Sequence, residues 1–156
     1  MRRTDREITD ENRIDEIIRT CKICRLGFCD EGEVYIVPLN FGYECESGRR
    51  VFYFHGASEG RKLELIRKTG KAGFEMDCGY EPISGETACT HSSRYRSIIG
   101  SGTVRLLEDR EEKKRGMLSI MAHITGKRDW ELPEAAMNAT AVFRLEVEKL
   151  SCKERK

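Results

Sequence analysis

The chain has 156 residues, with 28 Lys and Arg against 27 Asp and Glu, which gives a formal net charge of +1. This length suits one ordinary domain, so we expect a single domain over residues 1–156. The near-neutral charge argues against a general nucleic-acid-binding protein, which would carry a basic excess. No stretch approaches the roughly 20 apolar residues that a membrane helix needs.

Export and disulfide bonding are not predicted either. Basic residues open the chain, but no apolar run follows them, so a signal peptide is not expected. Cysteine occurs seven times, at positions 21, 24, 29, 45, 78, 89 and 152. With an odd number and no export signal, the simplest interpretation is reduced thiols in a cytoplasmic protein.

The first half of the chain predicts one helix followed by short strands. Residues 10–21 fit a helix, because Ile14, Ile17, Ile18 and Cys21 fall on one face. The strands and turns expected after it are a strand over 26–29, a turn at 30–33, a strand over 34–41, a turn at Gly48 and a strand over 50–55.

The middle of the chain predicts a short helix between strands. The helix covers residues 61–68, and the alternation over 74–78 indicates a half-buried strand. Residues 79–95 are expected to be mostly loop or irregular strand. A long strand over 96–107 contains Gly100 and Gly102, which suit a bend or a close backbone approach.

The last third predicts a helix that begins with a capping box, Asp109 as N-cap and Glu112 three residues on. Its apolar stripe is Met117, Ile120, Met121 and Ile124, and Gly126 ends it. His123 lies off this stripe and is expected at the surface or rim.

A short helix over 133–138 and a strand over 141–148 close the chain. In that strand Ala141, Phe143, Leu145 and Val147 are expected to be buried, and the alternate residues, Val142 among them, to face solvent. Because strands follow one another without helical crossovers, we predict a mainly β, α+β fold with an antiparallel sheet or barrel.

The densest chemical motif is His55-Gly56-Ala57-Ser58-Glu59-Gly60-Arg61-Lys62, at the junction of a strand and a helix. Small residues let a ligand approach the backbone, and the free N–H groups of a helix start favour an anion. Arg61 and Lys62 add positive charge that suits a phosphate. The motif therefore predicts either a phosphate cradle or an ordinary turn with two solvated basic residues.

The same stretch spells G-x-S-x-G, the pattern of a nucleophile elbow, which would make Ser58 an acyl-transfer nucleophile. His91 or His123 would then serve as base, with Asp109 or Asp129 as acid. However, such hydrolases need a central parallel sheet with crossover helices, and this chain has too few helices. A helix N-cap is the simpler role for Ser58.

Cys21 and Cys24 form a C-x-x-C pair that suggests a metal or redox site. A second closely spaced Cys/His pair is missing, and the pair follows a helix rather than preceding one. Core packing is the favoured interpretation, and no metal site is predicted. Pro38 indicates an edge strand, and Asn40 beyond it has an amide suited to a ligand or to solvent. No dinucleotide fingerprint or Walker motif is present.

Several segments together resemble the pyridoxamine 5′-phosphate oxidase-like flavoproteins, and within them the 5-nitroimidazole resistance (NimA-like) group. The motifs that carry the resemblance are, in chain order, Met1-Arg2-Arg3 with Asp5-Arg6-Glu7-Ile8, Tyr35-Ile36-Val37-Pro38-Leu39-Asn40-Phe41-Gly42-Tyr43, Phe52-Tyr53-Phe54-His55-Gly56-Ala57 with Gly60-Arg61-Lys62, Tyr95-Arg96-Ser97-Ile98-Ile99-Gly100-Ser101-Gly102, and Met121-Ala122-His123-Ile124-Thr125-Gly126. Each motif is weak alone, and their order and spacing over residues 1–150 make the set specific.

The resemblance implies an FMN-binding split barrel, a six-stranded antiparallel Greek-key β-barrel with flanking helices, acting as a homodimer with FMN at the subunit interface. Residues implied near the isoalloxazine are Val37, Pro38, Asn40, His55, Gly56 and Ala57. Residues implied near the phosphate or ribityl chain are Arg61, Lys62, Tyr95, Arg96 and Ser97. His123 and Trp130 are implied to reach the site from the other subunit.

The resemblance further implies an FMN-dependent reductase for a small acceptor such as a nitro-aromatic ring, with His55 as proton donor and NAD(P)H as a possible electron source. A non-catalytic flavin- or haem-binding protein is the first alternative, and the Ser58 hydrolase is the second. Neither nucleic acid nor a membrane is an expected partner.

Overall fold

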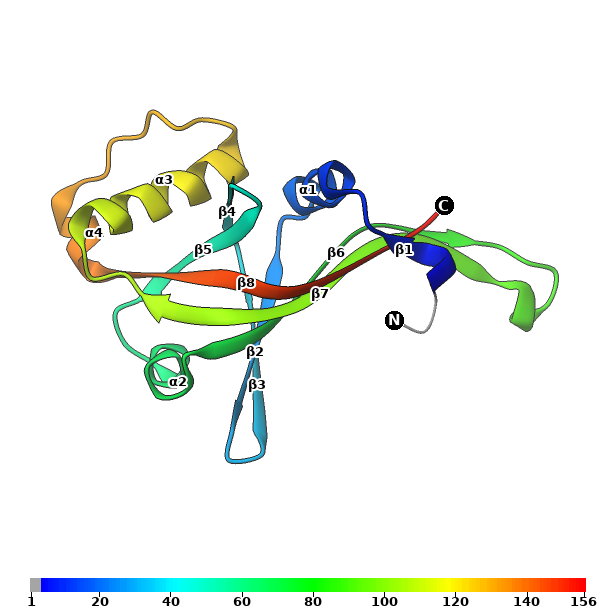
Figure 1. Cartoon of the computed structure of the whole chain (residues 1–156), viewed down its shortest axis with the longest axis horizontal. Helices are drawn as coiled ribbons and strands as arrows, with labels where there is room; N and C mark the ends of the chain where they lie inside the picture. The colour runs from blue at the N-terminus through cyan, green and yellow to red at the C-terminus, as the bar shows by residue number, and fades with distance from the viewer. Residues whose placement is uncertain (1–3) are drawn as a thin grey trace.

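Eight strands form one antiparallel sheet, and four α-helices pack around it in the computed structural model, which describes residues 4–156 (Figure 1). The Met1-Arg2-Arg3 motif lies outside the described residues. The helices are η1 (Thr4–Arg6), α1 (Glu11–Thr20), α2 (Arg61–Thr69), η2 (Ala88–Thr90), α3 (Arg110–Thr125) and α4 (Glu134–Ala139). The strands are β1 (Glu7–Ile8), β2 (Cys24–Asp30), β3 (Glu33–Leu39), β4 (Gly42–Glu46), β5 (Arg49–Ala57), β6 (Lys71–Ile83), β7 (Ser92–Leu106) and β8 (Thr140–Arg155).

The strand order is β3-β2-β6-β7-β8-β5-β4, and β1 adds to β8. The two edges, β3 and β4, follow each other in the chain yet do not pair, so the barrel is split between them. Every pairing is antiparallel. The predicted mainly β split barrel is therefore confirmed, with eight strands in the sheet rather than six.

The inner face of the curved sheet holds an aromatic core. Phe52 packs edge-on against both Phe41 and Phe74, with ring centroids 5.6 and 5.2 Å apart. Phe54 stacks on Phe143 at 5.4 Å. Edge-to-face and stacked rings are the preferred aromatic geometries, so these contacts add to the free energy of burial.

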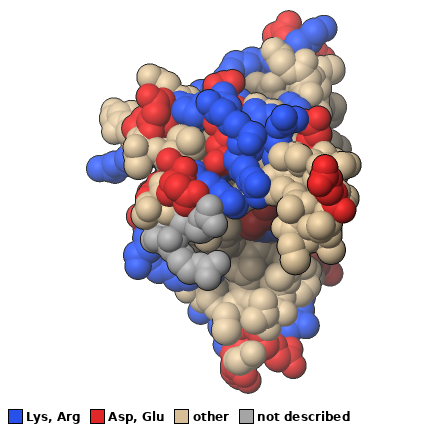
Figure 2. Space-filling model, turned by 90° about the vertical axis from the view of Figure 1, so that its right-hand side faces the viewer, with Lys and Arg blue, Asp and Glu red and all other residues tan. Residues whose placement is uncertain are grey.

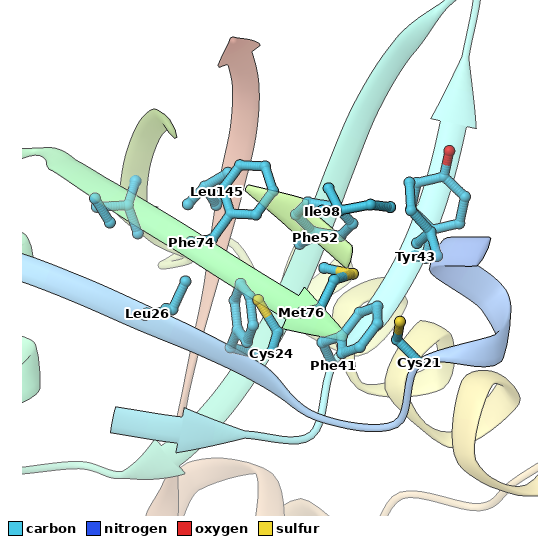
Figure 3. Packing of buried hydrophobic residues seen from close by; sticks show 14 of the residues in the cluster. Cys21, Cys24, Leu26, Phe41, Tyr43, Phe52, Phe74, Met76, Ile98 and Leu145 are labelled. Carbon is cyan, nitrogen blue, oxygen red and sulfur yellow. The ribbon is translucent and has the colours of Figure 1, made fainter. Parts of the chain in front are cut away.

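The C-x-x-C cysteines belong to this core. Cys21 and Cys24 are fully buried, and Figure 3 shows their side chains among Phe41, Met76 and other buried residues. Burial raises the pKa of both thiols well above the usual range. The prediction that these two cysteines pack in the core is confirmed, and all seven cysteines of the chain are unpaired.

The predicted first helix is confirmed as α1. The Asp10 carboxylate caps it by accepting a hydrogen bond from the Arg13 backbone N–H at 2.6 Å. Ile14, Ile17 and Ile18 are buried against the sheet, as the apolar spacing predicts. No helix among residues 4–156 is long and apolar enough to cross a membrane.

Two segments show how the strand bounds differ from the predictions. The predicted strand over 34–41 is β3, which ends two residues earlier, at Leu39, before β4 starts at Gly42. Residues 79–95 are not mainly loop: β6 continues to Ile83 and β7 begins at Ser92, around a β-bulge at Gly79. Long cross-strand pairing overrides the polar composition that indicates a loop there.

The helix α3 begins and ends as predicted, at Asp109 and Gly126, but only half of the capping box forms. The Asp109 carboxylate accepts from the Glu112 backbone N–H at 2.9 Å, whereas the Glu112 carboxylate accepts two bonds from Arg105. The prediction for Val142 is wrong, because α3 covers the outer face of β8 and buries it. On the same helix Ile124 of the predicted apolar stripe is 48% exposed.

A substitution at Gly102 tests the predicted close backbone approach in β7. A methyl group at Gly102 would lie 2.0 Å from the Glu146 carbonyl oxygen, so we expect Gly102→Ala to lower the free energy of unfolding by about 1–3 kcal/mol through overpacking. Gly73→Ala is the matched control, because its methyl would sit at an ordinary 3.7 Å from the Gly100 carbonyl oxygen. Equal denaturation midpoints for the two variants would contradict this account.

Candidate functional site

The candidate site lies where β5 ends and α2 begins. The end of β5 pairs with the start of β8, with His55 opposite Val142 and Ala57 opposite Thr140. The chain then turns through Gly60, whose φ of 117° favours glycine, and this residue caps α2 without a side chain. The first N–H groups of α2 are therefore close to the motif that the sequence predicts as a phosphate cradle.

Lys62 lies across Gly56. A methyl group at Gly56 would come within 2.5 Å of the Lys62 ammonium nitrogen, so only glycine accommodates this arrangement. The same nitrogen sits 5.6 Å from the centroid of the Phe143 ring, a cation–π contact. Among residues 4–156, no carboxylate lies within ion-pair distance of Lys62, and its burial lowers its pKa. A half-buried ammonium without a counter-charge suits an anionic ligand.

His55 adds a second unsatisfied polar group beside Lys62. Its Nδ1 is buried and has no hydrogen-bond partner among the described residues. Burial, and then the charge of Lys62, lower the pKa of His55 below 6.5. The imidazole is therefore neutral near pH 7 and has a ring nitrogen that a ligand can satisfy.

Arg61 and Ser58 have different structural roles from Lys62 and His55. Arg61 donates to the Glu33 carboxylate at 2.7 Å and lies over the Tyr35 ring at 5.2 Å. It therefore joins α2 to the β3 edge. Ser58 is exposed and is not the N-cap of α2, which is Gly60, so that prediction is wrong. The antiparallel sheet also lacks the parallel strands that a Ser58 nucleophile elbow needs.

On the β3 side, the predicted ring-contacting residues divide between core and surface. Val37 packs against the main core, and Pro38 is exposed on the sheet edge, opposite Arg25 of β2. The prediction of an edge strand at Pro38 is confirmed. Asn40 donates its amide to the Lys22 carbonyl at 3.1 Å, so it joins the β3–β4 link to the segment after α1.

Tyr95, Arg96 and Ser97 lie at the opposite end of the sheet from Lys62. Ser97 is opposite Lys153 on β8, whereas His55 is opposite Val142. Eleven residues of β8 separate the two positions, roughly 35 Å of extended strand. Figure 2 shows Lys and Arg side chains gathered on this end, where Arg94 and Arg96 line a hollow of about 270 Å³ with the C-terminal residues.

His123 and Trp130 each form side-chain contacts with other residues of their own chain. His123 is half-buried rather than at the surface, because its Nε2 bonds the Cys21 carbonyl at 2.8 Å and its ring lies 4.3 Å from Phe41. Burial lowers the pKa of His123. Trp130 is 42% exposed and donates to Thr125 at 3.2 Å. His123 belongs to α3 and Trp130 follows that helix, whereas His55 is on β5.

Sequence reasoning missed Phe143 as part of the site. Strand alternation predicts it to be buried, and it is, but its partnership with Lys62 depends on the pairing of β5 with β8. No local pattern could reveal that contact. A cavity of about 610 Å³ lies elsewhere, between α1, β4 and α3, and neither His55 nor Lys62 lines it.

Comparison with known proteins agrees with this architecture. The model of the family described as pyridoxamine 5′-phosphate oxidase matches residues 10–154. A crystal structure of a candidate 5-nitroimidazole antibiotic resistance protein from Bacteroides thetaiotaomicron is 30% identical, with a TM-score of 0.81, and the match covers 95% of this chain and 86% of that one. The search of curated proteins found no match.

Two more distant structures share the fold. The flavocytochrome Anf3 from Azotobacter vinelandii is 20% identical, with a TM-score of 0.82 over all of this chain and 72% of that one. The FAD and heme binding protein from Mycobacterium smegmatis is 17% identical, with a TM-score of 0.83 over 97% and 74%.

The two half-buried histidines predict a pH-dependent stability. Because the pKa values of His55 and His123 are lowered in the folded state, the unfolded chain binds more protons below pH 6.5, and the free energy of unfolding falls as pH falls. We expect this loss between about pH 7.5 and 5.5 to be smaller in His55→Gln, measured by urea denaturation. The exposed His91→Gln is the control, and an equal loss in both variants would contradict the assignment.

Proposed function

The chain belongs to the pyridoxamine 5′-phosphate oxidase family, and on that premise we propose that it is an FMN-dependent oxidoreductase that reduces small acceptors such as nitro-aromatic compounds. The observation that carries the proposal is the Lys62 ammonium, half-buried across Gly56 and lacking a counter-charge among the described residues. The unpartnered Nδ1 of His55 supports it. These groups fit a phosphorylated cofactor with a polar ring.

In this proposal Lys62 holds the FMN phosphate together with the backbone N–H groups at the start of α2. Gly56 keeps the path to Lys62 open, because a side chain there would displace the ammonium. Arg61 contributes through its charge and through fixing α2 against β3. When bound, FMN supplies the electron transfer, and the protein supplies binding and orientation.

His55 is the residue that we assign to proton transfer. In the unliganded chain the nearby Lys62 charge lowers the pKa of His55. A phosphate beside Lys62 offsets that charge, so binding moves the pKa of His55 back toward its ordinary value. The imidazole then takes up a proton more readily than in the unliganded chain, although its burial still lowers the pKa, and it can deliver that proton to a reduced acceptor.

We further propose that the working unit is a homodimer with shared cofactor sites. Within one chain Tyr95, Arg96 and Ser97 lie too far along β8 from Lys62 to touch the same phosphate. A second copy is needed to bring these residues to the site. The nitro-aromatic substrate is supported by the 30% identity to the candidate nitroimidazole resistance protein.

The first test is FMN affinity in Lys62→Ala. Loss of the ammonium should weaken FMN binding at least about ten-fold, because a charge-assisted phosphate contact is lost from a partly buried site. Fluorescence titration of the apoprotein measures it. Arg61→Ala is the matched control and should lose less, since Arg61 already pairs with Glu33. Unchanged affinity in Lys62→Ala would reject the phosphate assignment.

The second test is complementation between protomers. Ser97→Asp places a negative charge that should repel a phosphate, so this variant and Lys62→Ala should each bind little FMN alone. If the two residues serve one site from different protomers, co-expressed mixed dimers hold one intact site and should recover about half of the flavin. Recovery equal to either single variant would contradict the shared site.

The third test is turnover. Purified protein loaded with FMN should lose its flavin absorbance under anaerobic NAD(P)H and regain it on adding a nitroimidazole, with reduced drug as product. His55→Gln should retain FMN and slow the second step by about 10²-fold or more. Bound flavin that no donor reduces would support the non-catalytic alternative, and a haem absorbance band would overturn the FMN assignment.

A further inference from the structure

A two-lobed hollow is lined by residues of α1, β4 and α3, elements that Figure 1 shows apart from α2. The larger lobe has a volume of about 610 Å³ and the smaller about 290 Å³. Arg19, Tyr43 and Arg128 line both lobes, so the two are continuous. Together they have the dimensions of a site for a small metabolite.

The walls of the hollow carry an excess of positive charge. Four cations, Arg19, Lys114, Arg115 and Arg128, line the hollow against two carboxylates, the half-buried Glu44 and the exposed Glu111. Arg115 at 2.9 Å and Arg128 at 3.8 Å share Glu44. Arg19 stacks on the Tyr43 ring at 5.0 Å and has no carboxylate within ion-pair distance in the part of the chain that the structure describes. Lys114 likewise has none there. Two cations from different helices thus line the hollow outside any ion pair of the described residues, and the lining carries a net excess of two positive charges.

Ser119 supplies an independent sign of a ligand. It lines the smaller lobe from α3, is only 2% exposed, and its hydroxyl has no hydrogen-bond partner among residues 4–156. A helical serine ordinarily bonds the carbonyl four residues earlier, so an unpaired buried hydroxyl is costly. The cost is recovered if a bound group accepts the hydrogen bond.

We propose that this hollow binds a small organic anion with two negative groups, such as a dicarboxylate, a tricarboxylate or a phosphate ester. One negative group pairs with Arg19 where the lobes meet, and the Ser119 hydroxyl turns away from Gly42 to donate to that group. The other lies toward Lys114. Arg128 keeps its contact with Glu44 and also contacts the ligand. The ligand is then held by Arg128 on one side and by Arg19 on the other.

The site is separate from the proposed flavin site and does not depend on it. No residue of β5 or of α2 lines either lobe, so neither His55 nor Lys62 does. The volume of the two lobes suits a small metabolite. Binding here would act on β4 and α3, which pack directly on β5, the strand that carries His55.

The test uses the full chain and two named probes, citrate and inorganic phosphate, with the neutral amide benzamide as a negative control. We expect citrate to bind saturably by calorimetry, to bind more tightly than phosphate, and to raise the melting temperature. Benzamide should do neither. Absence of saturable binding by both anions would overturn the proposal.

Charge-matched variants locate the binding. Arg19→Gln and Lys114→Gln should each weaken citrate binding at least about ten-fold. Arg67→Gln removes the same charge from the exposed end of α2 and should leave the affinity unchanged. Lys62→Ala should also retain it, which distinguishes this site from the flavin site. Competition between citrate and FMN, or equal losses in Arg67→Gln, would overturn the assignment.

Ser119→Ala separates a binding role from a structural one. Without ligand, removing an unpaired buried hydroxyl should leave the melting temperature unchanged or raise it. With citrate, the stabilising shift should shrink. A variant that is less stable without ligand and binds citrate normally would show that the hydroxyl serves the fold and would overturn its role here.

Discussion

The pairing of β8 with both β5 and β7 is the constraint on which the rest of the structure depends. The start of β8 bonds to β5 and its whole length bonds to β7, so one strand joins the two parts of the split sheet. This pairing places Phe143 under Lys62 and the Tyr95–Ser97 segment at the far end. The glycines of β7 permit it, because the β8 carbonyls approach where a Cβ would otherwise stand. The contact between Phe143 and Lys62 and the separation of Lys62 from the Tyr95–Ser97 segment therefore both follow from the pairing of β8.

Each of the two sites contains at least one cation that forms no ion pair with the described residues. Most charged side chains have a partner, as in the Arg50 pair with Asp15 or the Lys68 pair with Asp30. Exposed pairs of this kind contribute little free energy each. Lys62, Arg19 and Lys114 differ, because each lies at a hollow or beside a glycine with no carboxylate at ion-pair distance among the described residues. A cation kept in that state destabilises the empty protein slightly and favours an anion when one is present.

Local patterns in the sequence predict much of the fold. The spacing of Ile14, Ile17 and Ile18 predicts α1, and Gly126 predicts the end of α3, because helix formation and termination depend on neighbouring residues. Local patterns do not predict that β6 continues to Ile83 and that β7 begins at Ser92. The residues of these extensions are polar, and they form strands because two long segments pair with each other, with a bulge at Gly79.

The candidate site was predictable in part for the same reason. The stretch from His55 to Lys62 is continuous, so its residue types already indicate a place for an anion. The contact with Phe143, the turn of Arg61 toward Glu33 and the burial of His123 against Phe41 all join distant segments. Such contacts follow from strand order and helix placement, which a single sequence does not specify. The resemblance to a known family predicted the fold, which local sequence patterns do not determine.

Pro38 has a consequence for how copies of this protein can meet. The register between β2 and β3 runs unbroken across it, as is usual where a proline nitrogen faces the open edge of a sheet. A strand arriving at that edge would find no N–H at Pro38 to bond, next to the exposed Ile36 and Val34 side chains. The edge therefore resists continuous sheet growth and the aggregation that follows from it. In the proposed homodimer, a second copy would therefore meet a face of the sheet more readily than the β3 edge, and a face is where a cofactor can be shared.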